Sequence, residues 1–325
     1  MLPGRVNGLV ISGGHGGPGP GYAGAMTGPG GAAAIRVAAC QLSLAVGEVT
    51  ANRAAARDAV HAAADAGAAV VVLPELTPSG YVFESPAEAR SLAEPADGPT
   101  VTEWQRLAAA RGLTIVGGFC EAGPGGGLLN SAVIVDGSGT RAVYRKAHLW
   151  DAEQEVFAPG RAAPPVVGTP WGRLAVMVCY DLEFPEWVRA AALAGADLLA
   201  APTNWPAEPV PPGERPVMVV NVQAAAAVNR IFIAAADRCG TERGVAWVGG
   251  SVIAGPEGYP LAGPVAADQP RILTADCDLS RARDKANSPR NNVHADRRTE
   301  LYGPVLAGSV LSGPQPGEVT SAAPA

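Results

Sequence analysis

The same order of predicted elements occurs twice in this chain, and this repetition constrains the fold more than any other feature. Each half begins with an apolar strand, a helix rich in alanine and a second apolar strand that ends in proline. These segments are 37–42, 51–67 and 67–74 in the first half, and 174–178, 185–195 and 195–202 in the second. The pattern predicts two copies of one β-α-β unit.

Both units continue with a further helix, a strand and a hairpin. The helices are expected over 102–111 and 217–229, the strands over 113–119 and 231–236, and the hairpin turns over 136–139 and 255–258. Right-handed crossovers place the helices of such a unit on one face of its sheet, which leaves the other face free to pack. We therefore predict an α/β fold: a four-layer α-β-β-α sandwich with two mixed sheets and an internal pseudo-two-fold duplication.

The two ends of the chain differ in composition from the repeated region. Residues 1–34 are dominated by Gly, Pro and Ala, which cannot bury enough surface to offset the entropy of ordering. We expect a disordered tail there and a second one over 304–325. Between them, 35–303 is predicted to form one domain, because the candidate catalytic groups come from both halves.

The charge of the chain argues against two classes of partner. The formal net charge is -6 over 325 residues, and no segment is rich in Lys or Arg. Binding to nucleic acid or to an anionic membrane surface needs such a basic patch. No run approaches the ~20 apolar residues that a membrane span requires. We expect neither nucleic acid nor membrane as a partner.

The cysteines are few and scattered, and they contain no CxxC pair that would suggest zinc or a disulfide framework. They are Cys40, Cys120, Cys179, Cys239 and Cys277. This pattern favours a reducing cytoplasm. No two histidines and a carboxylate occur at metal-ligand spacing either, so neither a metal nor another cofactor is expected.

Three polar residues each follow an apolar run, at the position where a buried strand should end. They are Glu75 after 70–73, Lys146 after Val143-Tyr144, and Cys179 after 174–178. The ends of buried strands are where α/β proteins usually build their sites. Together these residues supply a carboxylate to move protons, an ammonium to hold an oxyanion and a thiol to attack carbon.

With Glu75, Lys146 and Cys179 in this order, the sequence resembles the nitrilase, or carbon–nitrogen hydrolase, superfamily over about 35–303. Further matches are Gly80-Tyr81, the FAPG segment over 157–160 and the helix start FPEW over 184–187. The resemblance implies the same sandwich fold, a Glu-Lys-Cys catalytic triad and subunits that associate through helix faces.

Cys179 could be an inert buried residue, as a cysteine at the end of an apolar run usually is. The chain, however, becomes polar at once with Tyr180-Asp181, and Pro185 opens a helix shortly after. Such a turn presents the sulfur at a sheet edge and leaves backbone N–H groups free to stabilise an oxyanion. With the resemblance, this predicts Cys179 as the nucleophile.

The roles of the carboxylate and the ammonium have alternatives as well. Glu75 could be a solvated turn residue; as a general base it needs a raised pKa, which burial supplies. Arg145, Lys146 and His148 alternate along an extended segment, so Lys146 and His148 should face one way and Arg145 the other. The resemblance selects Lys146 as the oxyanion group.

A fourth catalytic group is implied by the resemblance, because family members often carry a second glutamate between the lysine and the PG turn. Both Glu153 and Glu155 qualify. Spacing from Lys146 and Phe157 favours Glu153, which would orient Lys146 and the attacking water. Glu155 is then a surface charge.

Other mechanisms lack the residues that they need. A thiol activated by histidine has only His148 as a partner, since the other three histidines lie in a tail, an Ala-rich helix and a polar C-terminal segment. The GxSxG nucleophile elbow is absent. A catalytically silent relative that serves as a binding or assembly module should have lost Glu, Lys or Cys, and all three are present.

The sequence therefore predicts an amidase that hydrolyses a small non-peptide carboxamide to the acid and ammonia through a thioester. The segment YDLEFPE after Cys179 resembles amidase branches of the family, whereas the nitrile-cleaving branch often has Trp-Glu directly after its cysteine. Hydrolysis of an N-carbamoyl amine or amino acid is the alternative, and nitrile hydrolysis is less favoured.

Aromatic residues near the predicted strand ends are candidates for the substrate pocket. Tyr81, Trp150 and Trp205 could form its walls or could be ordinary packing residues. Tyr180 is expected to shape the turn and to offer its backbone N–H. The predicted partners are a small amide substrate and further copies of the chain, in a homodimer or higher oligomer. The Ala-rich helix over 185–195 would permit close contact across a two-fold axis.

Overall fold

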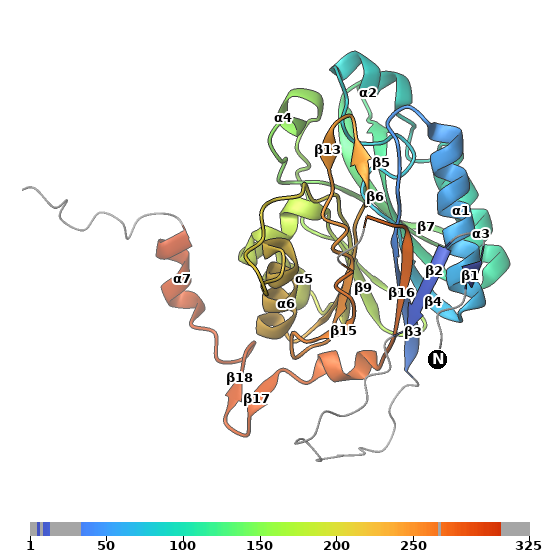
Figure 1. Cartoon of the computed structure of the whole chain (residues 1–325). Coiled ribbons are helices and arrows are strands. Elements are labelled where there is room, and N and C mark those ends of the chain that lie inside the picture. Colours follow the sequence, from blue (N-terminus) through green and yellow to red (C-terminus); the bar gives the residue numbers. More distant parts are fainter. Residues whose placement is uncertain (1–4, 7–8, 14–33, 266–267, 307–325) are drawn as a thin grey trace, which may run out of the picture. The chain divides into compact units, whose positions relative to one another are not determined.

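The computed structural model describes residues 5–6, 9–13, 34–265 and 268–306. The chain forms two compact units, 1–284 and 285–325. The first unit contains both large sheets (Figure 1). The described elements of the second are β17 (Ala286–Ser288), β18 (Asn291–Asn292) and α7 (Thr299–Leu306).

The first sheet has the strand order β1-β2-β16-β3-β4-β5-β6-β7. Its strands are β1 (Arg5–Val6), β2 (Leu9–Gly13), β16 (Arg271–Cys277), β3 (Ile35–Gln41), β4 (Ala68–Val72), β5 (Thr114–Ala122), β6 (Leu128–Asp136) and β7 (Gly139–Arg145).

The second sheet has the order β15-β14-β11-β10-β9-β8. Its strands are β15 (Pro260–Ala262), β14 (Val252–Ala254), β11 (Phe232–Ala236), β10 (Leu198–Pro202), β9 (Arg173–Val176) and β8 (Val166–Gly168). A separate short ribbon pairs β12 (Thr241–Glu242) with β13 (Val245–Ala246).

Strand directions confirm the predicted duplication. In the first sheet β3, β4 and β5 are parallel, and β6 and β7 return antiparallel. The second sheet repeats this with β9, β10 and β11 parallel and β14 and β15 antiparallel. An antiparallel strand borders the first strand of each set, β16 beside β3 and β8 beside β9. The two halves therefore share one topology.

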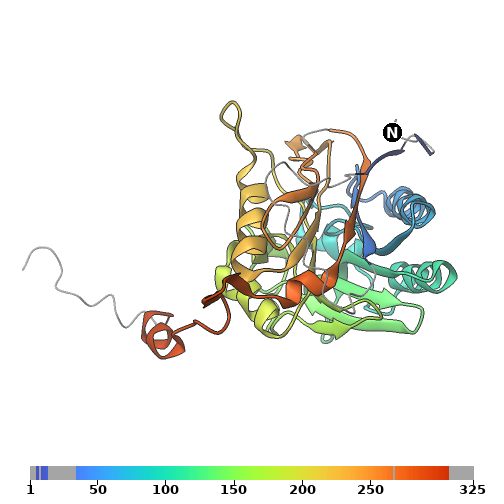
Figure 2. The same ribbon diagram turned by 90° about the horizontal axis from the view of Figure 1, so that it is seen from below.

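Four helices cover the outer faces of the two sheets. They are α1 (Val49–Asp65), α3 (Pro99–Arg111), α5 (Pro185–Leu193) and α6 (Val217–Asn229). Figures 1 and 2 show α1 and α3 on the first sheet and α5 and α6 on the second. Proline stands at the first turn of α3 and of α5, where its missing N–H costs no hydrogen bond. Gly112, with φ 65°, ends α3.

The hydrophobic core lies in two layers, as a sandwich requires. On β3, Val37 and Ala39 join the cluster that fills the space between the sheets, whereas Ala38 and Cys40 join the cluster with the buried residues of α1 and α3. Strands that alternate in this way are buried on both faces, which explains their continuous apolar sequence. The four-layer sandwich predicted from the sequence is confirmed.

The ends of the chain differ from the predicted domain limits. The disordered tail expected over 1–34 includes β2, which pairs in parallel with β16, so the prediction is wrong for 9–13. The run LVISG contains Val and Ile, which favour strands, and it meets an open sheet edge. The first compact unit ends at Asp284 rather than at 303, and α7 continues to Leu306. Within the expected tails the structure also describes β1, residue 34 and the end of α7, and the other tail residues lie outside the described part of the chain.

Among the described residues, no helix combines the length and the apolar character needed to cross a membrane.

Candidate active site

The three residues singled out in the sequence lie just beyond strands of the two sheets. Glu75 follows β4 by three residues, Lys146 follows β7 directly, and Cys179 begins the 3-10 helix η1 (Cys179–Glu183) after β9. All three are buried, with 0%, 1% and 5% of their surface exposed. The backbone of Glu75 is packed against Gly118, where an added Cβ would lie 2.6 Å from the Glu75 Cα. This close approach requires glycine.

The ammonium of Lys146 bridges two carboxylates. Its Nζ donates to Glu75 Oε1 at 2.8 Å and to Glu153 Oε1 at 2.7 Å. Asn130, on β6, donates from Nδ2 to the same Glu75 oxygen at 2.7 Å. Buried charges are tolerated when they are paired and hydrogen-bonded in this way. We call Glu75, Lys146, Glu153 and Asn130 the lysine cluster.

Glu153 opens the short helix α4 (Glu153–Val156) and is buried. Besides Lys146, its Oε1 accepts the Tyr81 hydroxyl at 2.6 Å, and its Oε2 accepts the Trp150 backbone N–H at 3.1 Å. Glu155, on the same helix, is exposed. The structure thus brings Glu153, and not Glu155, to Lys146.

The three basic residues that alternate in sequence have separate partners. Arg145 forms an ion pair with Glu121 at 2.6 Å and does not join the lysine cluster. The expectation that His148 faces the same way as Lys146 is wrong: His148 Nδ1 lies 2.7 Å from Asp181 Oδ1, and its ring stacks on Phe184. Strand β7 ends at Arg145, so the two-residue alternation of a strand does not continue to His148.

Asp181 supports the turn that carries the cysteine. Its carboxylate accepts the Tyr144 hydroxyl at 2.7 Å and the backbone N–H groups of Val178 and His148 at 3.1 Å. Cys179 lies between two residues of this network, Val178 and Asp181, and has a left-handed φ of 48°. A non-glycine residue in this region is strained, and such strain often marks a functional turn. The 3-10 helix begins here, and the first N–H groups of a helix have no intrahelical acceptor.

The electrostatics of the site follow from burial. Burial raises the pKa of Glu75 to about 7, the charge of Lys146 opposes this shift, and the charge of Glu153 adds to it. Burial alone would lower the pKa of Lys146, but the charges of Glu75 and Glu153 raise it, so the ammonium is retained. A carboxyl group that titrates near neutral pH can both accept and return a proton.

The same charged groups also act on the thiol of Cys179. Its pKa lies well above the usual value because the group is buried and because Glu75 is negatively charged, while the charge of Lys146 acts in the opposite direction. The Sγ also contacts the backbone oxygen of Asn204 at 3.7 Å. A thiol, a carboxylate and an ammonium thus act on one another in this site, and they are the set of groups that a nucleophilic attack on an amide needs.

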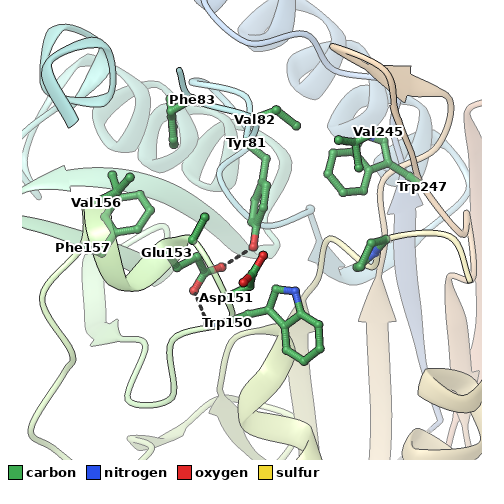
Figure 3. A pocket seen from close by; sticks show the side chains of 12 residues that line it. Tyr81, Val82, Phe83, Trp150, Asp151, Glu153, Val156, Phe157, Val245 and Trp247 are labelled. Carbon is green, nitrogen blue, oxygen red and sulfur yellow. Dashed lines mark hydrogen bonds between the residues drawn. The ribbon is translucent and has the colours of Figure 1, made fainter. Parts of the chain in front are cut away.

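Two of the four predicted pocket residues line a cavity that reaches the lysine cluster at Glu153. Figure 3 shows Tyr81 and Trp150 facing this cavity. Tyr180 does not line it but packs edge-on against Trp150 at 4.9 Å. Trp205 is 3% exposed and belongs to the core between strands and helices, so it is a packing residue.

Several residues of the site were not found from the sequence. Asn130 lies inside an apolar strand, and its contact with Glu75 spans 55 positions. Glu242 accepts the backbone N–H groups of Tyr81 and Val82 at 2.9 and 2.7 Å and pairs with buried Arg238 at 2.7 Å. No local pattern marks either residue. Within the described ranges, no group of three or more His, Cys, Asp or Glu could hold a metal ion.

Comparison with known proteins identifies the family. The Carbon-nitrogen hydrolase family model matches residues 36–287. The nitrilase of Pyrococcus abyssi (strain GE5 / Orsay) is 34% identical over 269 residues, which are 82% of this chain and 99% of that protein. N-carbamoylputrescine amidase of Solanum lycopersicum is 34% identical over 303 residues, which are 87% of this chain and 97% of that protein.

A solved structure agrees with these relatives. The amidase from Nesterenkonia sp. AN1, in a form that shows covalent addition of the acetamide moiety of fluoroacetamide at the active site cysteine, has a TM-score of 0.70 and 30% identity. The match covers 83% of this chain and 96% of that chain. Sequence, fold and relatives agree: the chain belongs to the carbon–nitrogen hydrolase, or nitrilase, superfamily, in its amidase-like branch, and is an enzyme that hydrolyses carbon–nitrogen bonds.

Proposed function

We propose that this enzyme hydrolyses a small non-peptide carboxamide to the acid and ammonia through a thioester on Cys179. The observation that carries the proposal is the lysine cluster: a buried ammonium held between two carboxylates, close enough to Cys179 for its charge to act on the thiol. An ammonium fixed in this way stabilises an oxyanion without reorganising during the reaction.

In the first half-reaction Glu75 takes the proton of the Cys179 thiol, and the sulfur attacks the carbonyl carbon. The oxyanion is held by Lys146 and by the backbone N–H of Tyr180. Glu75 then gives its proton to the leaving nitrogen, the carbon–nitrogen bond breaks, and ammonia departs. This leaves a thioester and an ionised Glu75.

In the second half-reaction Glu75 takes a proton from water, and the hydroxide attacks the thioester. The carbon–sulfur bond breaks, the thiolate regains its proton and the acid is released. Glu153 keeps Lys146 in place through both steps, since it accepts one of its hydrogen bonds. Two moderate barriers replace one high barrier.

The raised pKa of Cys179 makes the base essential. A thiol of this kind is a poor nucleophile until its proton is removed, and Glu75 is the carboxylate whose charge acts on it most strongly. The pKa of about 7 makes Glu75 a stronger base than an exposed glutamate.

Hydrolysis of an N-carbamoyl compound is the second candidate. The observation that favours it is the similarity to N-carbamoylputrescine amidase along 87% of this chain. The same groups would act on a ureido carbonyl. We also propose a cytoplasmic location, which the five free thiols support because they persist in a reducing compartment.

Mass spectrometry of enzyme quenched during turnover tests the proposal. The peptide that contains Cys179 should gain the mass of the acyl group of the amide, and ammonia should be released in step with the acid. Cys179→Ala should abolish both signals, whereas Cys120→Ala should retain them, because Cys120 is buried with its pKa raised to about 12. An acyl group on another residue, or turnover by Cys179→Ala, would overturn the assignment.

A further inference from the structure

The cavity that reaches Glu153 has a volume of about 220 Å³. It is lined by Tyr81, Val82, Phe83, Trp150, Asp151, Ala152, Glu153, Val156, Phe157, Pro206, Val245 and Trp247. Pockets for drug-sized ligands measure roughly 300–1,000 Å³. A cavity of this volume has room only for a short chain.

Aromatic rings form much of the wall of this cavity. Tyr81 meets Trp247 edge-on with ring centroids 5.6 Å apart, and Phe83 meets Phe157 edge-on at 6.1 Å. The Tyr81 hydroxyl is already used by Glu153 (Figure 3). The wall therefore offers mainly apolar surface and ring faces, which favour an alkyl chain or a cation.

The charged groups of the lining are all acidic. Asp151 and Glu153 are its only ionisable carboxylates, and no Lys, Arg or His is among the lining residues. Glu153 is committed to Lys146, Tyr81 and Trp150. Asp151 is exposed, and its carboxylate forms no hydrogen bond or ion pair with another described residue. It is thus a free negative charge at an apolar pocket.

The backbone holds Asp151 in this place. Its φ is 42°, in the left-handed region, and its carbonyl oxygen accepts the N–H of Gln154 at 3.1 Å as α4 begins. Asp and Asn adopt this conformation more readily than other side chains do. The turn that places Glu153 in the lysine cluster therefore also places Asp151 on the lining of the pocket.

We propose that the pocket selects amides whose non-reacting part is a short alkyl chain ending in an amine cation, with Asp151 as the residue that recognises the ammonium. The alkyl part lies against the aromatic wall, and the cation pairs with the Asp151 carboxylate. The inference rests on the proposed amidase function and names its substrate class. It disfavours substrates that end in a carboxylate, including N-carbamoyl amino acids, because the lining offers them no cation.

Three primary amides of matched length test this selection. They are hexanamide, its ω-amino derivative and its ω-carboxylate counterpart, adipic acid monoamide. We expect kcat/KM to be highest for the ω-amino amide and at least about tenfold lower for the ω-carboxylate amide. This is the size of effect expected when one nearby carboxylate attracts the first substrate and repels the second. Equal values for these two substrates, or a preference for the carboxylate, would overturn the inference.

Variants of Asp151 assign the preference to this residue. Asp151→Asn keeps the shape and the left-handed backbone, and should lower the ratio of kcat/KM for the ω-amino amide over hexanamide by about threefold to fivefold, as for a partly exposed ion pair. Asp151→Lys should reverse the order of the two charged amides. The matched control is Glu155→Gln, which removes an exposed carboxylate that does not line the pocket and should leave the ratio unchanged.

The outcomes separate this inference from the amidase proposal. If hexanamide acylates Cys179 and the three amides react equally well, the inference about Asp151 is wrong but the proposed amidase function stands. If none of the three amides acylates Cys179 or releases ammonia, the function fails with this substrate class. Binding of the ω-amino amide to Cys179→Ala, measured by calorimetry and weakened by Asp151→Asn, would support the recognition independently of turnover. Unchanged binding in the double variant would contradict it.

Discussion

At the scale of single residues, the site depends on one ammonium held away from water. Lys146 is 1% exposed and has two carboxylate partners, whereas its neighbour Arg145 is on the surface side and pairs with Glu121. Removing one member of a buried ion pair leaves the other charge unpaired, which costs about 3–5 kcal/mol. Substitutions at Arg145 and at Lys146, which are adjacent and carry the same charge, should therefore have very different effects on kcat.

Lys146→Ala should lower kcat by at least about a hundredfold, because it removes the proposed oxyanion stabiliser and leaves Glu75 and Glu153 without their cation. Arg145→Ala should have a mild effect on kcat, since its ion pair is partly exposed. Steady-state kinetics of both variants, with circular dichroism to confirm folding, provide the measurement. Equal losses at the two positions would mean that Lys146 has no special role.

The pH dependence should follow Glu75. Its pKa is raised, to about 7, so the base is protonated and inactive at lower pH, and kcat/KM should rise as the pH increases through this value. The charge of Glu153 contributes to the raised pKa of Glu75. Glu153→Gln should therefore move the rise of kcat/KM to lower pH, and it should also reduce the maximal rate. Glu155→Gln should not change the pH at which kcat/KM rises. A shift of this rise to higher pH in Glu153→Gln would contradict this account.

At the scale of elements, a contact between distant segments positions the pocket wall. The turn at Gly80, with φ 80°, leaves no room for a Cβ, which would lie 2.2 Å from the Val46 backbone. Glu242, in β12, accepts the N–H groups that follow this turn and pairs with Arg238, whose guanidinium lies 5.6 Å from the centre of the Trp247 ring. The ion pair of Arg238 and Glu242 thus contacts both Tyr81 and Trp247, which line the pocket.

Glu242→Gln should raise KM more than it lowers kcat, because it loosens Tyr81 and Trp247 without touching the nucleophile. It should also lower the melting temperature, since Arg238 is left buried without its carboxylate. Glu88→Gln is the matched control: Glu88 pairs with Arg243 nearby, but the pair is partly exposed, so both effects should be small. A fall in kcat alone, with KM unchanged, would show that Glu242 does not position the pocket.

At the scale of the whole molecule, the outer face of α6 is unusually apolar. Val217, Val220 and Val228 are 54%, 45% and 52% exposed, and they lie with Ala224 at helical spacing on one side of the helix. Leu193 on the neighbouring α5 is 42% exposed. We propose that this face mediates a homodimer or higher oligomer, in which the same surface meets its own copy.

Ala224→Arg should dissociate this assembly by placing a charge in the apolar stripe. Ala51→Arg, at an exposed alanine of α1, is the control and should leave the assembly intact. A charge at Ala192 would not test the interface, because Ala192 is 1% exposed and belongs to the core. Light scattering at micromolar concentration is the measurement. A monomeric wild type with full activity would refute the proposed assembly.

The sequence by itself determined the elements and their repetition, and it predicted which residues carry the chemistry. Each of these is a local signal: the run of apolar residues that makes a buried strand, the proline that begins α5, and the polar residues that follow strand ends. Such signals extend over a few positions, so the order of residues alone is enough to predict the duplicated sandwich, and together with the family resemblance it predicts the triad of Glu75, Lys146 and Cys179.

The tertiary structure decided how these residues meet. Only packing shows that His148 turns away from Lys146, that Asn130 and Tyr81 donate to the two carboxylates that hold Lys146, and that Trp205 is a core residue. These contacts join segments far apart in the chain, and their geometry depends on how two sheets pack against each other. No local periodicity encodes it, so the charge and shape of the pocket become visible only in the folded protein.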